Sequence, residues 1–320
     1  MNDLRSNVMP GLPFDPKAAV SYGKFVNAAY TMYTGLANTR PPPSADFPPD
    51  YELAAWILMR DFVIVETDPV FYGFIANKKN DPTKLVVAIR GTDNPAEIWD
   101  DLNALGMQAF LVNGVQIGNV ALGFGRIYET MQIVPVSTST PMPPKDGGGI
   151  SFGEQVAQFV KLHATSKLGA ADSAASISVD ITGHSLGSAL ATYYVVENAT
   201  AHKIKNPAIC TFASPKVGDS DFTGAFNKLD LTSWRVANVR DAVPNLPPWF
   251  LFTHVNTQQL IDSTGRASPG LICCHKLTTY LHVLDPQYPV DQDCQVVPAH
   301  LVSGETPEMA VKEGIRPAGV

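Results

Sequence analysis

The chain has 320 residues, of which 45% are apolar, so it is long enough to bury a substantial core. Its net charge of −7 is spread along the sequence, which leaves no basic surface for nucleic acid or an anionic membrane. No uncharged apolar run approaches the length of a membrane span. We therefore expect a globular protein without a nucleic-acid partner or a transmembrane segment.

The chain shows no internal repeat or break in composition, which favours one domain over residues 1–320. Its first residues, MNDLRSNVMPGLPFDPKAAV, lack the basic and apolar regions of a secretory signal. This absence favours a cytoplasmic or non-classically secreted protein.

The first half of the chain is expected to combine one helix with several strands. Residues 16–35 have helical periodicity, and the proline-rich segment RPPPSADFPPDYE then interrupts it. The sequence FVIVETDPVFYGFIANKKNDPTKLVVAIRG indicates strands joined by a turn at Asn80, Asp81 and Pro82. Residues 93–105 indicate a short amphipathic helix, which is either a lid that turns its apolar face toward lipid or a fixed surface helix.

Strands and helices alternate in the second half. The composition of residues 136–149 is typical of a mobile loop. The predicted elements after it are a helix at 151–168, a strand at 175–183, a helix at 186–199, a strand at 208–215, a helix at 219–229 and a strand at 233–241. This alternation predicts an α/β fold with a mostly parallel central sheet and helices on both faces. Functional sites in such sheets lie at the carboxyl ends of the strands.

One turn in this region has the pattern of a nucleophile. Gly183-His184-Ser185-Leu186-Gly187 fits Gly-x-Ser-x-Gly between a predicted strand and a predicted helix. The glycines avoid collisions in a strained turn, and the N–H of Leu186 would face a developing oxyanion. A phosphate-binding loop fits less well because its glycine and lysine patterns are absent.

A serine hydroxyl needs a base and an acid, which in this fold class follow it in the sequence. Asp241 is the expected acid because it ends the strand SWRVANVRD, whereas Asp219 and Asp221 sit where a helix would be capped. Three histidines compete as the base: His275 after a loop, His282 seven residues later, and His254. Spacing alone does not separate them, and His184 is expected to make a structural hydrogen bond.

A second oxyanion donor is expected from a strand end upstream of the serine. Thr92, which follows Arg90-Gly91, can offer its N–H and its hydroxyl. The four cysteines are too few for a disulfide scaffold and lack the spacing of a zinc site. Cys210 is expected to be buried, and a bond from Cys294 to Cys273 or Cys274 is left open. No metal or cofactor is expected.

Six segments together resemble the class 3 lipase family of α/β-hydrolases, which includes the fungal lipases. They are VVAIRGTDNPAEIWDDL, GFGRIYE, DITGHSLGSALA, CTFASPKVGDSDFTGAFN, WRVANVRDAVPNLPP and HKLTTYLHVLD. The resemblance covers about residues 60–285, and its last segment is similar to plant phospholipase A1-type members. It implies Ser185 as nucleophile, Asp241 as acid, His275 as base, and Thr92 and Leu186 as the oxyanion hole.

The sequence departs from the family pattern at positions that carry no catalytic group. Ser188 stands where the third glycine is usual, Ala121 where histidine is frequent, and Ala213 and Lys216 where glycine and arginine are frequent. We expect a monomeric serine ester hydrolase that cleaves acyl lipids of the triacylglycerol type through an acyl-enzyme, at a lipid–water interface. The alternatives are a phospholipase A1, an esterase for short-chain or aromatic acyl groups, and a lipase-like binding protein without catalysis.

Overall fold

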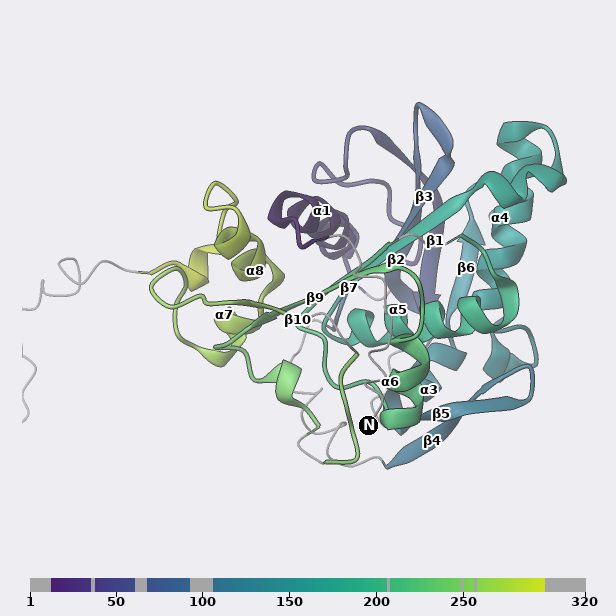
Figure 1. Cartoon of the computed structure of the whole chain (residues 1–320). Coiled ribbons are helices and arrows are strands. Elements are labelled where there is room, and N and C mark those ends of the chain that lie inside the picture. The colour runs from purple at the N-terminus through teal and green to yellow at the C-terminus, as the bar shows by residue number, and fades with distance from the viewer. Residues whose placement is uncertain are drawn as a thin grey trace, which may run out of the picture.

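The computed structural model describes residues 13–35, 38–60, 68–92, 106–205, 208–247, 250–255 and 258–296. Within these ranges an eight-stranded sheet has the order β10-β9-β8-β7-β3-β2-β1-β6 (Figure 1). Its strands are β1 (Tyr51–Met59), β2 (Val70–Lys78), β3 (Asp81–Ile89), β6 (Gln132–Pro135), β7 (Ser178–His184), β8 (Ala208–Phe212), β9 (Thr232–Asn238) and β10 (Gln258–Ile261). The pairs from β10 to β3 are parallel, and β2, β1 and β6 extend the sheet by antiparallel pairing. The expected mostly parallel sheet is therefore present, with an antiparallel side.

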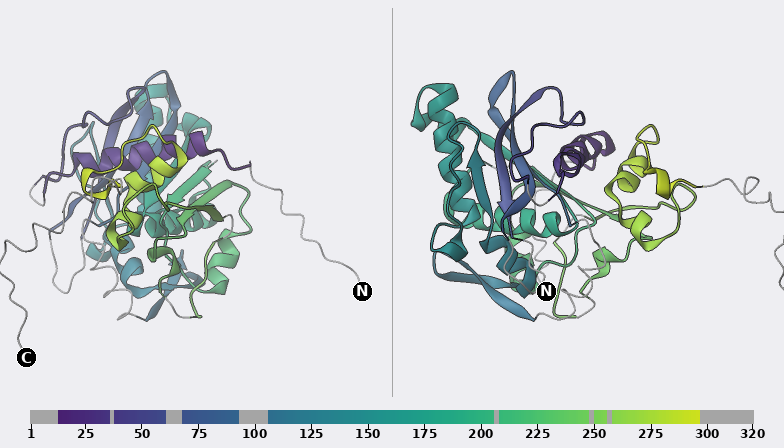
Figure 2. Two further views of the ribbon diagram at one scale, coloured as in Figure 1. Left: turned by 90° about the vertical axis from the view of Figure 1, so that its left-hand side faces the viewer. Right: turned by 180° about the vertical axis from the view of Figure 1, so that it is seen from behind.

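Helices cover both faces of this sheet (Figures 1 and 2). They are α1 (Pro16–Met32), α3 (Leu122–Glu129), α4 (Phe152–Leu168), α5 (Leu186–Glu197), α6 (Ser220–Phe226), α7 (Leu271–His275) and α8 (Leu277–Leu284). Helices α1, α7 and α8 lie on one face, and α3 to α6 lie on the other. Apolar side chains fill the space on each side, so both faces of the central strands are buried, as parallel sheets require.

Local sequence signals fix the ends of two helices that the site depends on. The Asp15 carboxylate accepts a hydrogen bond from the N–H of Lys17 and Pro16 occupies the first turn, so α1 begins where a cap and a helix-compatible proline coincide. Ser151 caps α4 in the same way, and Gly169 ends that helix in the left-handed region. These ends agree with the sequence expectations to within a few residues.

Five strands were not expected from the sequence. Strand β1 lies directly after the proline-rich segment, β6 and β10 are only four residues long, and β4 (Met107–Val112) pairs with β5 (Val115–Ala121) in a separate hairpin. Asn113 and Gly114 form the hairpin turn with φ of 51° and 76°, which matches the Asn-Gly turn preference. Strands as short as β6 and β10 carry too little periodicity to be separated from loops.

Two of the predicted segments can be compared with the structure only in part. The expected helix at 93–105 lies outside the described residues. The segment 136–149 is described, and it contains a 3₁₀ turn at Lys145–Gly147 whose Lys145 and Asp146 side chains pair with Glu129 and Arg60. None of the helices within the described ranges combines the length and apolarity that crossing a membrane requires.

Candidate active site

Ser185 occupies a sharp turn between β7 and α5. Its φ of 55° and ψ of −124° lie in a region that side chains rarely adopt, and its N–H donates to the carbonyl of Phe212 on β8. Strained backbone of this kind persists only where the surroundings impose it. The turn therefore presents the serine at the carboxyl end of the central parallel strand, where sites of open α/β sheets lie.

Gly183 and Gly187 are required here by close packing. A Cβ on Gly183 would fall on the backbone of Gly187, and a Cβ on Gly187 would fall on the backbone carbonyl of Ile89 at the end of β3. The spacing of the Gly-x-Ser-x-Gly pattern is thus a steric consequence of fitting the turn between β3 and α5.

The structure brings Ser185, His275 and Asp241 together in one hydrogen-bonded row. His275 Nε2 lies 2.9 Å from Ser185 Oγ, and His275 Nδ1 lies 2.8 Å from Asp241 Oδ2. Because the carboxylate oxygen accepts the Nδ1–H, the neutral imidazole leaves Nε2 free to take the hydroxyl proton. All three residues are buried. This is the geometry that nucleophilic catalysis by a serine requires.

Two details of this row differ from the sequence expectations. Asp241 lies three residues beyond the end of β9, in a turn where its Oδ1 accepts a hydrogen bond from the N–H of Val243. His275 is the last residue of the short helix α7, not part of a loop. Five residues give too little periodicity to identify such a helix in the sequence, although Gly270 marks its start.

The competing histidines point elsewhere. His282 Nδ1 lies 2.7 Å from the carbonyl oxygen of Tyr288, and His254 Nε2 lies 2.6 Å from that of Pro244. His184 contacts Tyr30 and the backbone of His275, so it makes the structural hydrogen bonds that were expected of it. Asp219 caps α6 by accepting from the N–H of Phe222. Of the candidates open in the sequence, only His275 reaches Ser185.

Tyr280 on α8 supports the acid and was missed by the sequence reasoning. Its hydroxyl donates to Asp241 Oδ2 at 2.7 Å and accepts from the N–H of Asn238 at 3.1 Å. Burial, followed by the nearby Asp241 charge, raises the pKa of Tyr280 well above its ordinary value, so the hydroxyl keeps its proton. Its position five residues after His275 was the only available signal.

The segment Gly91-Thr92 follows β3 and lies beside Ser185. A Cβ on Gly91 would come within 2.9 Å of Ser185 Cβ, so this backbone packs directly against the serine. Thr92 lines a cavity of about 350 Å³ together with His184, His275 and Lys276. Leu186 contributes the first amide of α5, immediately after Ser185. Both expected oxyanion donors are thus in the neighbourhood of Ser185.

The buried side chain of Arg90 holds the Gly91-Thr92 segment in place by hydrogen bonds. It is 1% exposed, and its Nη1 donates to the carbonyl of Gly91 at 2.8 Å while Nε and Nη2 donate to the carbonyl of Phe71 on β2. Its guanidinium lies 3.8 Å from the ring centre of Tyr33 and 4.1 Å from that of Tyr72. Since a peptide unit is planar, fixing the Gly91 carbonyl also fixes the direction of the Thr92 N–H.

The helix that ends at His275 is tied to residues 291–294 on both sides of the histidine. Cys273 forms a disulfide with Cys294, which resolves the pairing that the sequence left open. Lys276 Nζ lies 2.6 Å from Asp291 Oδ2 and 3.4 Å from Asp293 Oδ2. Cys274 and Cys210 are buried free thiols.

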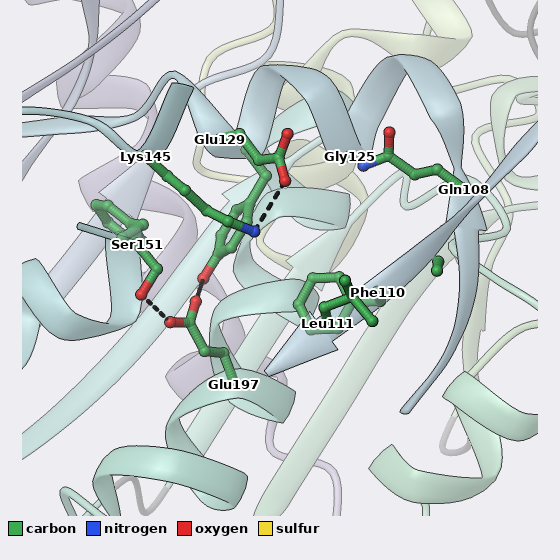
Figure 3. A pocket seen from close by; sticks show the side chains of 11 residues that line it. Gln108, Phe110, Leu111, Gly125, Glu129, Lys145, Ser151 and Glu197 are labelled. Atoms are coloured by element: carbon green, nitrogen blue, oxygen red, sulfur yellow. Dashed lines mark hydrogen bonds and ion pairs between the residues drawn. The ribbon is translucent and has the colours of Figure 1, made fainter. Parts of the chain in front are cut away.

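A second hollow lies away from Ser185, at the carboxyl end of α5 (Figure 3). Its volume is about 20 Å³, which is room for one water molecule. The Glu197 carboxylate accepts hydrogen bonds there from Ser151 and from Tyr128, the latter at 2.6 Å. Burial raises the pKa of Glu197, but hydrogen bonds from His202, Ser151 and Tyr128 outweigh burial and lower it overall. His202 contacts the Glu197 carboxylate and not the Ser151 hydroxyl, and Ser151 also caps α4, so we interpret the cluster as a structural one.

The described part of the chain contains no group of three or more His, Cys, Asp or Glu side chains placed to hold a metal ion.

Comparison with known proteins supports the α/β-hydrolase class that this fold and site define. Residues 86–251 match the family described as lipase (class 3). Because this match spans more than half of the chain, the protein belongs to the class 3 lipase family.

Relatives by sequence include plant proteins named phospholipase A1. Phospholipase A1-II 3 of Oryza sativa subsp. indica is 33% identical over 220 residues, which cover 62% of this chain and 48% of the relative. The chloroplastic phospholipase A1-Ialpha2 of Arabidopsis thaliana is 23% identical over 88% of this chain and 62% of its own length. This chain therefore spans about half the length of the first of these relatives.

Solved fungal lipases share the fold. The nonglycosylated LIP2 lipase of Yarrowia lipolytica superposes with a TM-score of 0.55 at 18% identity, over 78% of this chain and 81% of that one. The mono- and diacylglycerol lipase of Aspergillus oryzae gives 0.53 at 16% identity over the same shares.

Proposed function

We propose that this protein is a serine carboxylic ester hydrolase that cleaves acyl esters of lipids through an acyl-enzyme. The observation that carries the proposal is the row of two hydrogen bonds, 2.9 Å from His275 to Ser185 and 2.8 Å from His275 to Asp241. Family membership and the strained Ser185 turn support the same reading.

In the proposed reaction, His275 Nε2 takes the proton from Ser185 as its oxygen attacks the ester carbonyl. Asp241 orients the imidazole and stabilises its charged form, and the imidazolium then protonates the leaving alcohol. Thr92 and Leu186 are the proposed oxyanion donors. In the second half of the reaction His275 takes a proton from water as the water oxygen attacks the acyl carbon. The bond to Ser185 Oγ then breaks, the imidazolium returns the proton to Oγ, and the fatty acid is released.

The surroundings of His275 favour a lipid substrate. Leu271 and Ile272, on the helix that ends at this histidine, are 64% and 60% exposed, and Ile272 also lines the cavity beside the site. Triacylglycerol-type esters were the first expectation. The relatives with 33% identity are named phospholipase A1, which favours phospholipids as the second candidate substrate.

The deciding experiment uses a panel of tri-, di- and monoacylglycerols and phosphatidylcholine, with released fatty acid as the readout. Ser185→Ala should abolish hydrolysis of every active substrate and labelling by a fluorophosphonate. Ser188→Ala is the matched control, because the Ser188 hydroxyl donates only to the carbonyls of Gly183 and Phe212. Full activity of Ser185→Ala would refute the mechanism. A wild-type protein that neither hydrolyses nor labels would favour the non-catalytic alternative.

A further inference from the structure

Tyr30 on α1 joins the oxyanion segment to the nucleophile turn. Its hydroxyl accepts a hydrogen bond from the N–H of Gly91 at 2.8 Å and lies 2.8 Å from His184 Nδ1. A Cβ on Gly91 would come within 2.6 Å of the same hydroxyl and within 3.0 Å of the His184 carbonyl oxygen. The three groups therefore meet with no room for another side chain between them.

The hydrogen-bond partners of His184 fix its tautomer. Its Nε2 lies 2.8 Å from the carbonyl oxygen of His275, which can only accept, so Nε2 carries the proton. Burial, followed by repulsion from His275, lowers the pKa of His184 well below its ordinary value, so the ring is neutral and Nδ1 is an acceptor. The Tyr30 hydroxyl, already an acceptor for Gly91, therefore donates its proton to Nδ1.

These bonds form one directed chain from the Gly91 N–H through the Tyr30 hydroxyl and the His184 ring to the carbonyl of His275. Its first member adjoins Thr92, and its last member is the backbone of the base. The ring of His184 also packs against that of His275, with centres 4.8 Å apart. This chain of hydrogen bonds thus links the Gly91-Thr92 segment to His275, two parts of the site that are far apart in the sequence.

We propose that Tyr30 and His184 are positioning residues that hold the oxyanion segment and His275 in register with each other. This proposal rests on the proposed function, because it assigns a role within the same reaction. Neither side chain is placed at the reacting atoms. Their effect is geometric, and losing a productive alignment by about 1 Å can cost on the order of 100-fold in rate.

Tyr30→Phe is the first test. It leaves the Gly91 N–H and His184 Nδ1 without this partner, and we expect kcat for p-nitrophenyl butyrate to fall about 10- to 100-fold with little change in KM. Tyr22→Phe is the matched control on the same helix, since the Tyr22 hydroxyl donates to Asp180 at 2.8 Å and takes no part in the chain. The proposal would be overturned if Tyr30→Phe had the kcat of the wild type and the same melting temperature as Tyr22→Phe.

The two ends of the His184 ring can be tested separately. In His184→Gln the side-chain amide can still donate to the His275 carbonyl, whereas His184→Leu can neither donate nor accept. We expect Gln to retain several-fold more kcat than Leu at similar KM. Equal kcat in the two variants would show that the ring acts only by filling space.

A double variant tests whether the residues act as one chain. If they do, Tyr30→Phe combined with His184→Leu should be only about two-fold slower than His184→Leu alone, whereas independent contributions multiply. A fold-reduction in kcat in the double variant equal to the product of the two single-variant reductions would overturn the proposal. Ser185→Ala, assayed beside this set, separates the two proposals. Full activity of Ser185→Ala would refute the serine mechanism, while an active wild type with unaffected Tyr30 variants would refute only the positioning chain.

Discussion

Tyr280 and His275 hydrogen-bond to the same oxygen of Asp241, at 2.7 and 2.8 Å. One carboxylate oxygen thus receives two donors from neighbouring helices, while the other is held by the backbone of Val243. The acid cannot rotate without breaking one of these bonds, so its orientation toward the imidazole is fixed from three directions.

Tyr280→Phe should therefore weaken catalysis more than binding. We expect kcat to fall about 10-fold with KM nearly constant, because one charge-assisted hydrogen bond that orients Asp241 is lost. Tyr193→Phe deletes a comparable buried hydrogen bond, to the Val217 carbonyl, and should leave kcat within about two-fold. Steady-state kinetics on a soluble ester check this, and a change confined to KM would contradict it.

Replacement of Arg90 should damage both the site and the fold. In Arg90→Met the carbonyls of Gly91 and Phe71 lose a buried donor, which costs roughly 1–3 kcal/mol each in unfolding free energy. We expect kcat to fall by at least 10-fold, since Thr92 is then held less firmly. Arg235→Met provides the control, because this buried arginine donates to Gln258 and not to the carbonyls of Gly91 and Phe71. Equal kcat losses in the two variants would argue for a general folding defect.

The exposed apolar residues of α7 lead to a prediction about lipid surfaces. Leu271→Ser should lower activity on emulsified triacylglycerol several-fold and leave hydrolysis of a soluble short-chain ester almost unchanged, because Leu271 is 64% exposed and less apolar area would meet the lipid. Leu260→Ser on β10 is the control, as Leu260 is 63% exposed on a different element. Parallel losses on both substrates would point to damage at His275 instead.

Reduction of the Cys273–Cys294 disulfide should make the position of His275 less well fixed. It closes a loop that contains His275, and removal of such a link typically costs about 2–4 kcal/mol. Cys273→Ser is expected to lower the melting temperature and kcat together, and a reducing agent should reproduce both effects in the wild type. Cys210→Ser, which alters a buried free thiol on β8, should not respond to the reducing agent differently from the wild type.

His254 should make the fold sensitive to acid. Burial, followed by repulsion from Arg235, lowers its pKa from 6.5 to about 4. Below pH 6.5 His254 is protonated in the unfolded chain and stays neutral in the folded chain until the pH approaches 4. The free energy of unfolding therefore falls as the pH falls, by about 2 kcal/mol at about pH 5. His254→Gln should remove that part of the loss. Denaturant unfolding at about pH 8 and pH 5 measures it, and an identical pH dependence in the variant would contradict the assignment.

Much of the site could be predicted from the sequence, because close packing at the Ser185 turn requires a local pattern of glycines. Gly183 and Gly187 are spaced by the steric demands of one turn, and Asp241 follows a recognisable strand. The helices α1 and α4 carry side-chain caps, and α5 follows directly on the Gly-x-Ser-x-Gly pattern. All three were predicted to within a few residues of their ends.

The remainder depends on contacts between distant parts of the chain. Spacing could not choose among His254, His275 and His282, because only the fold of α7 against β9 brings one of them to Ser185, and the choice came from the family resemblance. Tyr30 and Tyr280 are ordinary helix residues in the sequence, and their roles follow from atoms that lie up to 154 residues away. Strand β1 was hidden by the prolines that precede it.

The placement of Tyr30 on α1 has a practical consequence for anyone who would clone this protein by its family match. Residues 86–251 include Ser185 and Asp241 but omit His275, Tyr280 and the helix that carries Tyr30. A fragment trimmed to those borders would keep the Gly-x-Ser-x-Gly signature and lack the imidazole that the proposed mechanism uses as its base. Truncation at the amino terminus should therefore stop before Asp15, whose carboxylate starts that helix.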